Sequence, residues 1–313
     1  MPICVFDIYP DGTTTVPTDT NLTGPGAYRW WHFDLSDEML EPWAREHLHD
    51  IPAGSLVQKQ TRPRCDQFNG GLILNLRGIN MNEGQDADEM VSVRMFVESD
   101  LLITVRRTRV FALDTLRQLA EVQNAPPSPA EFLEGLVARL TARVQEHVAG
   151  IYEQTDFFEV DLEDTTTKMP RELPEIRRSV IRLRRYLGPQ RAALSKLAAL
   201  DIPLIPQESQ LELHEQANSA MISVEELDEL RDRLVSVQEE HDVYVAQRQA
   251  RHGYVLSVAA ALFLPLGFIT GLFGVNVGGM PGTGHPWAFT LLCLGMGALA
   301  VLMFALLRKL RWI

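Results

Sequence analysis

The stretch that decides the fold is YVLSVAAALFLPLGFITGLFGVNVGGMPGTGHPWAFTLLCLGMGALAVLMFALL, residues 254–307, which contains no Asp, Glu, Lys or Arg. All 29 Lys and Arg residues and all 41 Asp and Glu residues of the chain lie outside it. Two parts of it, residues 254–273 and 287–307, each have the roughly 20 apolar residues that a helix needs to cross a bilayer. Residues 274–286 between them are rich in Gly and Pro, which do not continue a helix. We therefore predict two membrane-spanning helices joined by an outer loop.

Basic residues predict the orientation of these spans. Arg248 and Arg251 precede the first span, and Arg308, Lys309 and Arg311 follow the second, whereas the loop between the spans is uncharged. Cytoplasmic flanks are enriched in Lys and Arg, so we expect both termini in the cytoplasm. The whole chain carries −12 and its last six residues carry +3, which leaves −15 on residues 1–253. This net negative charge argues against nucleic acid as a partner, because binding phosphates needs a surplus of Lys and Arg.

The region before the spans reads as a soluble domain followed by helices. Helical patterns cover residues 37–48, 111–122 and 128–164, and in the last of these Ser128, Pro129 and Glu131 form a capping-box start. Short apolar or alternating runs between residues 27 and 106 predict strands. The runs are YRWWHFDL (28–35), SLVQKQ (55–60), GLILNLRGIN (71–80), MVSVRMFVES (90–99) and LLITVRR (101–107), with a hairpin turn at the Gly70–Gly71 pair. We predict a cytoplasmic α/β/α domain, residues 1–165, with a mixed or antiparallel sheet.

Residues 166–253 are predicted to form cytoplasmic helices and a stalk. Apolar residues recur at helical spacing through residues 174–200, where Gly188–Pro189 is expected to kink or interrupt the helix. A second helix begins near Gln207 and continues without Pro or Gly to Gly253, in phase with the first span. If it continues through the first span to Phe273, this helix would be about 100 Å long at 1.5 Å per residue. Because helices gain most of their stability from packing, we expect this one to be bundled with copies of itself.

One face of the predicted stalk and first span has small residues at every position except Leu264. Alternating steps of four and three give Ala246, Ala250, Gly253, Ser257, Ala260, Leu264, Gly267, Gly271 and Gly274, which we call the small-residue face. The opposite, large-residue face comprises Arg248, His252, Val255, Val258, Leu262, Leu266, Ile269 and Phe273. Small residues at this spacing permit close helix packing. The alternative is a symmetric bundle in which the small-residue face surrounds an axial path wide enough for a hydrated ion, and the large-residue face meets the second span and lipid.

The segment LFLPLGFITGLFGVNVGGMPG, residues 262–282, resembles the CorA family of divalent-metal transporters. The family signature is Gly-Met-Asn at the outer end of the first of two C-terminal spans, and here the positions read Gly274-Val275-Asn276. The Val and the absence of an acidic residue in the following loop resemble the zinc-transporting branch known as ZntB. The plan of the whole chain, a soluble α/β domain, a long stalk, two spans and a basic tail, is similar as well.

Membership of this family implies a homopentameric funnel in the bacterial inner (plasma) membrane, with the first span of each subunit lining a central pore. Asn276 would then form a ring of amide oxygens that contacts the hydration shell of a divalent cation at the outer mouth. Gly274 would let the backbone turn sharply, and Leu264 would form an apolar constriction. Val275 replaces the Met of the family and has no assigned role.

Two further places invite a metal-binding interpretation. Glu239, His241 and Asp242 lie on the stalk, where copies would repeat them around one axis, although an exposed charged helix face is more often only solvated. His285 is the one conventional zinc ligand in the outer loop, although it also reads as a plain loop residue.

No catalytic motif occurs in the sequence: GxSxG, HExxH and phosphate-binding glycine loops are absent. We therefore expect no enzyme and no cofactor, with a divalent cation as the transported substrate. The leading hypothesis is zinc transport, with any proton coupling relayed by His or water since residues 254–307 lack carboxylates. The alternatives are a magnesium or cobalt channel of the same family, and a membrane-anchored cytoplasmic binding or signalling module.

Overall fold

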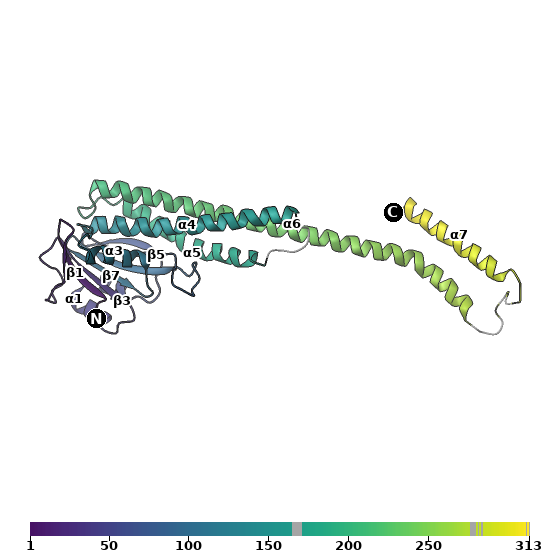
Figure 1. Ribbon diagram of the computed structural model, residues 1–313, viewed down its shortest axis with the longest axis horizontal. Coiled ribbons are helices and arrows are strands. Elements are labelled where there is room, and N and C mark those ends of the chain that lie inside the picture. Colours follow the sequence, from purple (N-terminus) through teal and green to yellow (C-terminus); the bar gives the residue numbers. More distant parts are fainter. Residues whose placement is uncertain (165–170, 276–279, 281, 283, 311, 313) are drawn as a thin grey trace. The chain divides into compact units, whose positions relative to one another are not determined.

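The computed structural model describes the chain except residues 165–170, 276–279, 281, 283, 311 and 313 and the side chains of residues 160–164 (Figure 1). It divides into two compact units, Met1–Val237 and Gln238–Ile313. The strands are β1 (Cys4–Ile8), β2 (Thr14–Thr15), β3 (Tyr28–Asp34), β4 (Arg64–Phe68), β5 (Gly71–Gly78), β6 (Val91–Val97) and β7 (Leu101–Arg106). The helices are α1 (Leu40–His47), α2 (Asp50–Val57), α3 (Phe111–Glu121), α4 (Pro129–Asp164), α5 (Leu173–Ala198), α6 (Gln207–Gly274) and α7 (Ala288–Lys309).

The strands form one mixed sheet in the order β2-β1-β3-β7-β6-β5-β4. Only the β3–β7 pair is parallel among the described strands, and its register places Trp31 opposite Ile103. The predicted strands at residues 28–35, 71–80, 90–99 and 101–107 are confirmed as β3, β5, β6 and β7. The β4–β5 hairpin turns at Asn69 and Gly70, which both have positive φ, as the glycine pair indicated.

The predicted strand SLVQKQ is wrong. Its first three residues end helix α2, and the strand of this region is β4, which begins at Arg64. The helix is favoured because His49 accepts a hydrogen bond from the backbone N–H of Ile51 and because Ala53 and Leu56, three residues apart, are both buried. Read alone, the apolar residues at positions 56 and 57 fit either element.

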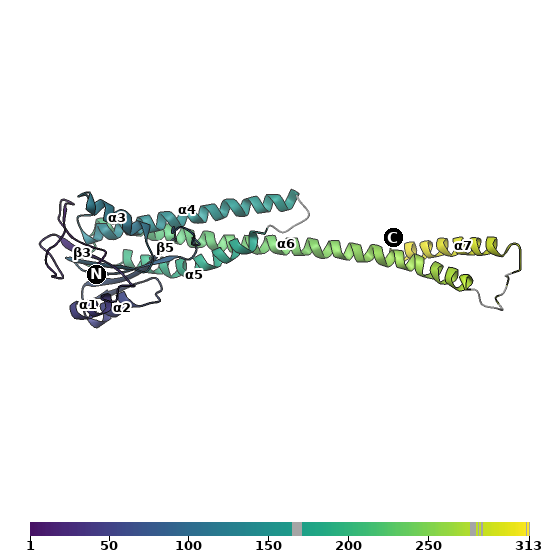
Figure 2. The same cartoon turned by 60° about the horizontal axis from the view of Figure 1, so that its bottom comes forward.

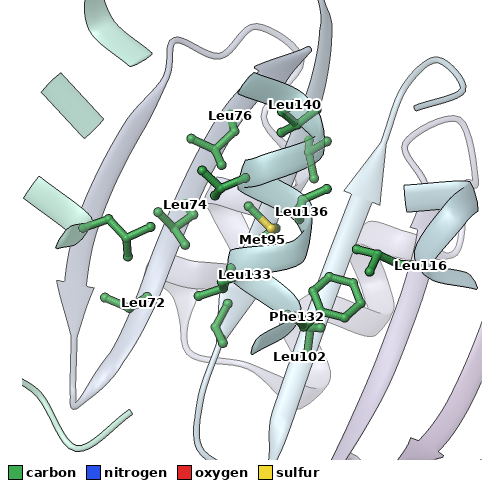
Figure 3. Packing of buried hydrophobic residues seen from close by; sticks show 14 of the residues in the cluster. Leu72, Leu74, Leu76, Met95, Leu102, Leu116, Phe132, Leu133, Leu136 and Leu140 are labelled. Atoms are coloured by element: carbon green, nitrogen blue, oxygen red, sulfur yellow. The ribbon is translucent and has the colours of Figure 1, made fainter. Parts of the chain in front are cut away.

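Helices cover both faces of the sheet, so the predicted α/β/α arrangement is confirmed (Figure 2). Alternation along β3 separates two cores, since Trp30 packs with α4 on one face and Trp31 with α1 and α2 on the other. In the larger core, leucines of β5 meet leucines of α4 (Figure 3). They are Leu72, Leu74 and Leu76 on the strand and Leu133, Leu136 and Leu140 on the helix.

The helices α4, α5 and the first part of α6 form a bundle with its own apolar core. The predicted apolar positions of α5 are all buried there or against the sheet; they are Ile176, Val180, Leu183, Leu187, Leu194 and Leu197. The predicted interruption at Gly188–Pro189 does not occur, because α5 continues through Pro189. Next to it the buried Gln190 binds the edge of β5, accepting from the Arg77 N–H at 2.6 Å and donating to the Arg77 carbonyl at 2.9 Å.

A buried ion pair ties β1 to β3. The side chain of Arg29 is 0% exposed and donates from Nε and Nη2 to the two carboxylate oxygens of Asp7, at 2.6 and 2.9 Å. Its Nη1 reaches the half-exposed Asp19 and the carbonyl of Asn21, each at 2.6 Å. Each of the three guanidinium nitrogens therefore donates to an oxygen.

Candidate functional site

The unit Gln238–Ile313 contains two helical stretches long and apolar enough to cross a membrane. Eighteen-residue windows reach a mean hydropathy of 2.2 in α6 and 2.4 in α7. In those windows 0% and 6% of the residues are buried in the single chain. Apolar helices with so little covering require an apolar surrounding, which a bilayer provides.

The small-residue face of α6 is uncovered. All of its members, from Ala246 to Gly274, are exposed. At Gly253, Gly267, Gly271 and Gly274, no heavy atom of a described neighbouring residue lies within 4 Å of where a Cβ would stand. Leu264, the one large member, is 71% exposed. The described residues of the single chain therefore leave this face exposed.

The large-residue face is partly covered. Val258, Leu262, Leu266 and Ile269 are half-buried, whereas no member of the small-residue face is. On α7, half-buried residues recur at helical spacing, and they include Leu292, Met296, Leu299 and Met303. A cavity of about 780 Å³ is lined by Ile269 and Phe273 of α6 together with Leu292, Met296 and Leu299 of α7. The large-residue face thus turns toward the second span. Our sequence reasoning did not single out these α7 positions, although their spacing of three and four residues was visible in it.

Pro265 lies inside α6, next to Leu264. It has no N–H to donate to the carbonyl of Ala261, yet the helix continues to Gly274. One turn further on, the Thr270 hydroxyl donates to the Gly267 carbonyl at 3.0 Å.

The outer end of α6 carries the Gly-Val-Asn positions. Gly274 is its last residue and Val275 follows with its side chain 52% exposed. Asn276 lies outside the described residues. His285 helps to begin α7: its Nδ1 accepts from the Trp287 N–H at 3.3 Å and its carbonyl accepts from the Ala288 N–H at 3.1 Å. The His285 side chain therefore already has a structural use.

The acidic cluster on α6 does not form a metal site within one chain. Glu239 and Asp242 are exposed, and His241 Nδ1 lies 4.0 Å from the nearer Asp242 carboxylate oxygen. Within the described ranges, no three side chains of His, Cys, Asp or Glu are arranged to hold a metal ion. A metal role for these three residues stays a prediction that depends on several copies meeting.

Comparison with known proteins decides the family. Residues 25–309 match the family model described as CorA-like Mg²⁺ transporter protein. The chain belongs to the CorA family. A CorA-family protein with two spans is a divalent-cation transporter and not an enzyme, as the sequence predicted.

Two named relatives are similar to this chain over most of its length. The divalent cation transporter CmaX of Pseudomonas aeruginosa is 32% identical over 91% of this chain and 87% of its own. The zinc transport protein ZntB of Pectobacterium atrosepticum is 30% identical over 85% of this chain and 82% of its own.

Two solved structures are similar in fold to this chain over nearly its whole length. The structure of full-length CmaX has a TM-score of 0.86 and 31% identity, covering 99% of this chain and 98% of its own. The CorA magnesium transporter of Methanocaldococcus jannaschii shares the fold alone, with a TM-score of 0.80, 14% identity and complete coverage of both chains. The predicted plan of a soluble α/β/α domain, a long helix and two C-terminal spans is confirmed.

Proposed function

We propose that this transporter carries zinc, or a divalent cation of similar size, through a homopentameric pore lined by the small-residue face of α6. The observation that carries the proposal is the contrast between the two faces: the small-residue face is exposed throughout, whereas the large-residue face is half-covered toward α7. A ring of such helices leaves room at its axis only if small side chains point inward. The membrane would be the bacterial inner membrane, with both termini in the cytoplasm, because basic residues flank both spans.

At the outer mouth, Asn276 would present its amide oxygen to the hydrated cation. Neutral oxygen dipoles recognise an ion through its water without the tight hold of a carboxylate ring, which suits conduction. Leu264 would narrow the pore where α6 passes the middle of the bilayer. Zinc is preferred over magnesium as the substrate because the ZntB relatives are named zinc transport proteins and because Val275 stands where the family has Met.

Cysteine accessibility tests the lining. Ala260→Cys and Leu262→Cys place thiols on the two faces, within one helical turn of each other. Cys293 is exposed on α7 and must first be replaced by Ser. Burial raises the pKa of the Cys4 and Cys65 thiols to about 12, so these two should stay unreactive.

A small water-soluble thiol reagent should then block cation flux through Ala260→Cys and leave flux through Leu262→Cys unchanged. Equal labelling at both positions would refute the axial assignment. Labelling at neither would favour close helix packing of the small-residue face.

Substrate and coupling are tested in vesicles that contain the purified protein. Zinc uptake should exceed magnesium uptake, and an inward proton gradient should raise it if protons are coupled. Uptake of magnesium or cobalt alone would favour the other transport hypothesis. No flux of any divalent cation would leave the spans as an anchor for a cytoplasmic module.

The exposed acidic cluster of α6 would gather cations near the cytoplasmic mouth once several copies surround one axis. Glu239→Gln together with Asp242→Asn should lower zinc occupancy measured by calorimetry on the full-length protein. Unchanged occupancy would show that these side chains, and His241 between them, are only solvated.

A further inference from the structure

The Met1–Val237 unit contains a cavity of about 910 Å³ whose walls are strongly basic. The segment before β4, the strands β5 and β6, the turn after β7 and helix α5 each contribute to it. We call it the basic pocket, and its cationic lining consists of Lys59, Arg62, Arg64, Arg77, Arg107 and Arg185. Glu89 is the one carboxylate among the lining residues. This collection stands out because residues 1–253 as a whole are acidic, at −15.

Most of these cations have no carboxylate partner. Within the part of the chain that the structure describes, only Arg64 of the six forms an ion pair, at 3.6 Å from Asp66, and Lys196 shares that carboxylate at 3.1 Å. The side chains of Lys59, Arg62 and Arg107 are exposed at the pocket and form no ion pair with any described carboxylate. Like charges gathered without counter-ions repel one another, so an anion would stabilise the cluster.

A buried arginine stands behind the pocket. Arg94 is 1% exposed and donates to the carbonyls of Gln58 and Lys59, at 2.9 and 3.3 Å, and to the Ser92 hydroxyl at 3.0 Å. All three acceptors are neutral, so no described carboxylate compensates the charge of Arg94. Burial, with Arg77 and Arg107 nearby, lowers the pKa of Arg94 to about 10. Its bonds also fix the 58–59 segment that forms one wall.

Arg77 is built into another wall in a similar way. Its two terminal nitrogens donate to the carbonyls of Met90 and Thr61, at 2.7 and 2.8 Å, and its guanidinium lies 4.4 Å from the centre of the Tyr186 ring. The Nε atom is buried and has no hydrogen-bond partner among the described residues. Burial lowers the pKa of this side chain as well. A partly desolvated charge without a described carboxylate partner is costly, so its position next to a cavity favours an anionic ligand.

We propose that the basic pocket binds a small anion that carries two or more phosphate groups. Guanidinium groups match phosphate oxygens in geometry, and several of them converge here from separate elements. The volume lies in the range of small-molecule sites. The excess of unpaired cations over the single carboxylate calls for an anion with several charges, which a diphosphate group supplies. This site is separate from the spans and does not depend on which cation is transported.

Calorimetry with inorganic pyrophosphate on the full-length protein, in a buffer free of divalent metal, tests the proposal. Binding should saturate at one pyrophosphate per chain, should weaken as salt is raised, and should be at least tenfold tighter than binding of sulfate at the same ionic strength. Arg62→Glu with Arg107→Glu should weaken it tenfold or more. Both side chains are exposed, and Arg62→Gln with Arg107→Gln provides a milder version that should weaken binding in the same direction.

The matched control is Arg45→Glu with Arg143→Glu, which changes the net charge equally. Both arginines are exposed and pair with a carboxylate of their own helix, outside the basic pocket. The control should bind pyrophosphate as the unaltered protein does. Equal weakening in both double variants, or sulfate binding as tight as pyrophosphate binding, would overturn the proposal. Absence of pyrophosphate binding would overturn it as well. If Arg62→Glu with Arg107→Glu also dissociated the oligomer, the pocket would be assigned to acidic residues of a neighbouring copy.

Discussion

Replacing Asp7 with Ala should leave the Arg29 guanidinium buried without its main counter-charge. Removing one partner of a buried ion pair typically costs about 3 to 5 kcal/mol, because the other charge remains in a poorly polarisable interior. Arg29 keeps Asp19 and the Asn21 carbonyl at 2.6 Å, so the lower end of that range applies. For a unit of this size, about 3 kcal/mol corresponds to a fall of roughly 6 to 12 °C in Tm.

Thermal unfolding followed by tryptophan fluorescence measures this effect, because Trp30 and Trp31 directly follow Arg29 in β3. Asp19→Ala should lower Tm clearly less, since Asp19 is half-exposed and water can replace it. The double change Asp7→Leu with Arg29→Met should recover most of the loss, because it removes both charges together. A Tm for Asp7→Ala no lower than that of Asp19→Ala would refute the reasoning.

Three further outcomes are expected. Burial, with Arg106 nearby, lowers the pKa of His32 to about 4. The neutral form of His32 should therefore contribute up to about 3 kcal/mol of stability above pH 6.5, and this contribution is lost as the pH falls toward 4. Over this interval the Tm of His32→Gln should fall less than the Tm of the unaltered protein. Gln190→Leu leaves a backbone N–H and a carbonyl of β5 without their partner, and denaturant unfolding should show a loss of about 1 to 3 kcal/mol, whereas an unchanged midpoint would show that other groups take over. Asn276→Ala should abolish vesicle uptake of zinc and cobalt together, while His285→Ala should retain most of it; loss of zinc uptake alone in His285→Ala would indicate direct ligation at the mouth.

The spans, most strands and most helices were predictable because their signals are local. The uncharged stretch from Tyr254 to Leu307 and the apolar spacing of α5 need no knowledge of neighbouring elements. Helix α2 was not predicted because the short apolar pair at positions 56 and 57 fits either period, and β1, β2 and β4 are too short to carry a clear alternation. Tertiary packing decided those segments.

The residues of the candidate site likewise divide into those that a local sequence pattern predicts and those that it does not. The small-residue face follows from spacing within one helix, and the structure keeps it exposed. Asn276 was identified only through the family motif, since a lone amide in a loop has no distinctive pattern. The basic pocket was out of reach, because Arg62, Arg77, Arg107 and Arg185 come from separate elements that only the fold brings together.

Pro265 has a mechanical consequence for the first span. A helix that lacks one backbone hydrogen bond bends more easily at that point than elsewhere. The segment from Leu266 to Gly274 can therefore tilt about the Ala261–Pro265 turn, carrying Gly274 at its tip and Val275 just beyond it. Leu264 lies at the pivot of this lever, where a small angular change moves the side chain least. In the proposed pore, bending would thus widen or narrow the outer end of the span while Leu264 stays close to its place, and the two ends of one helix would respond separately.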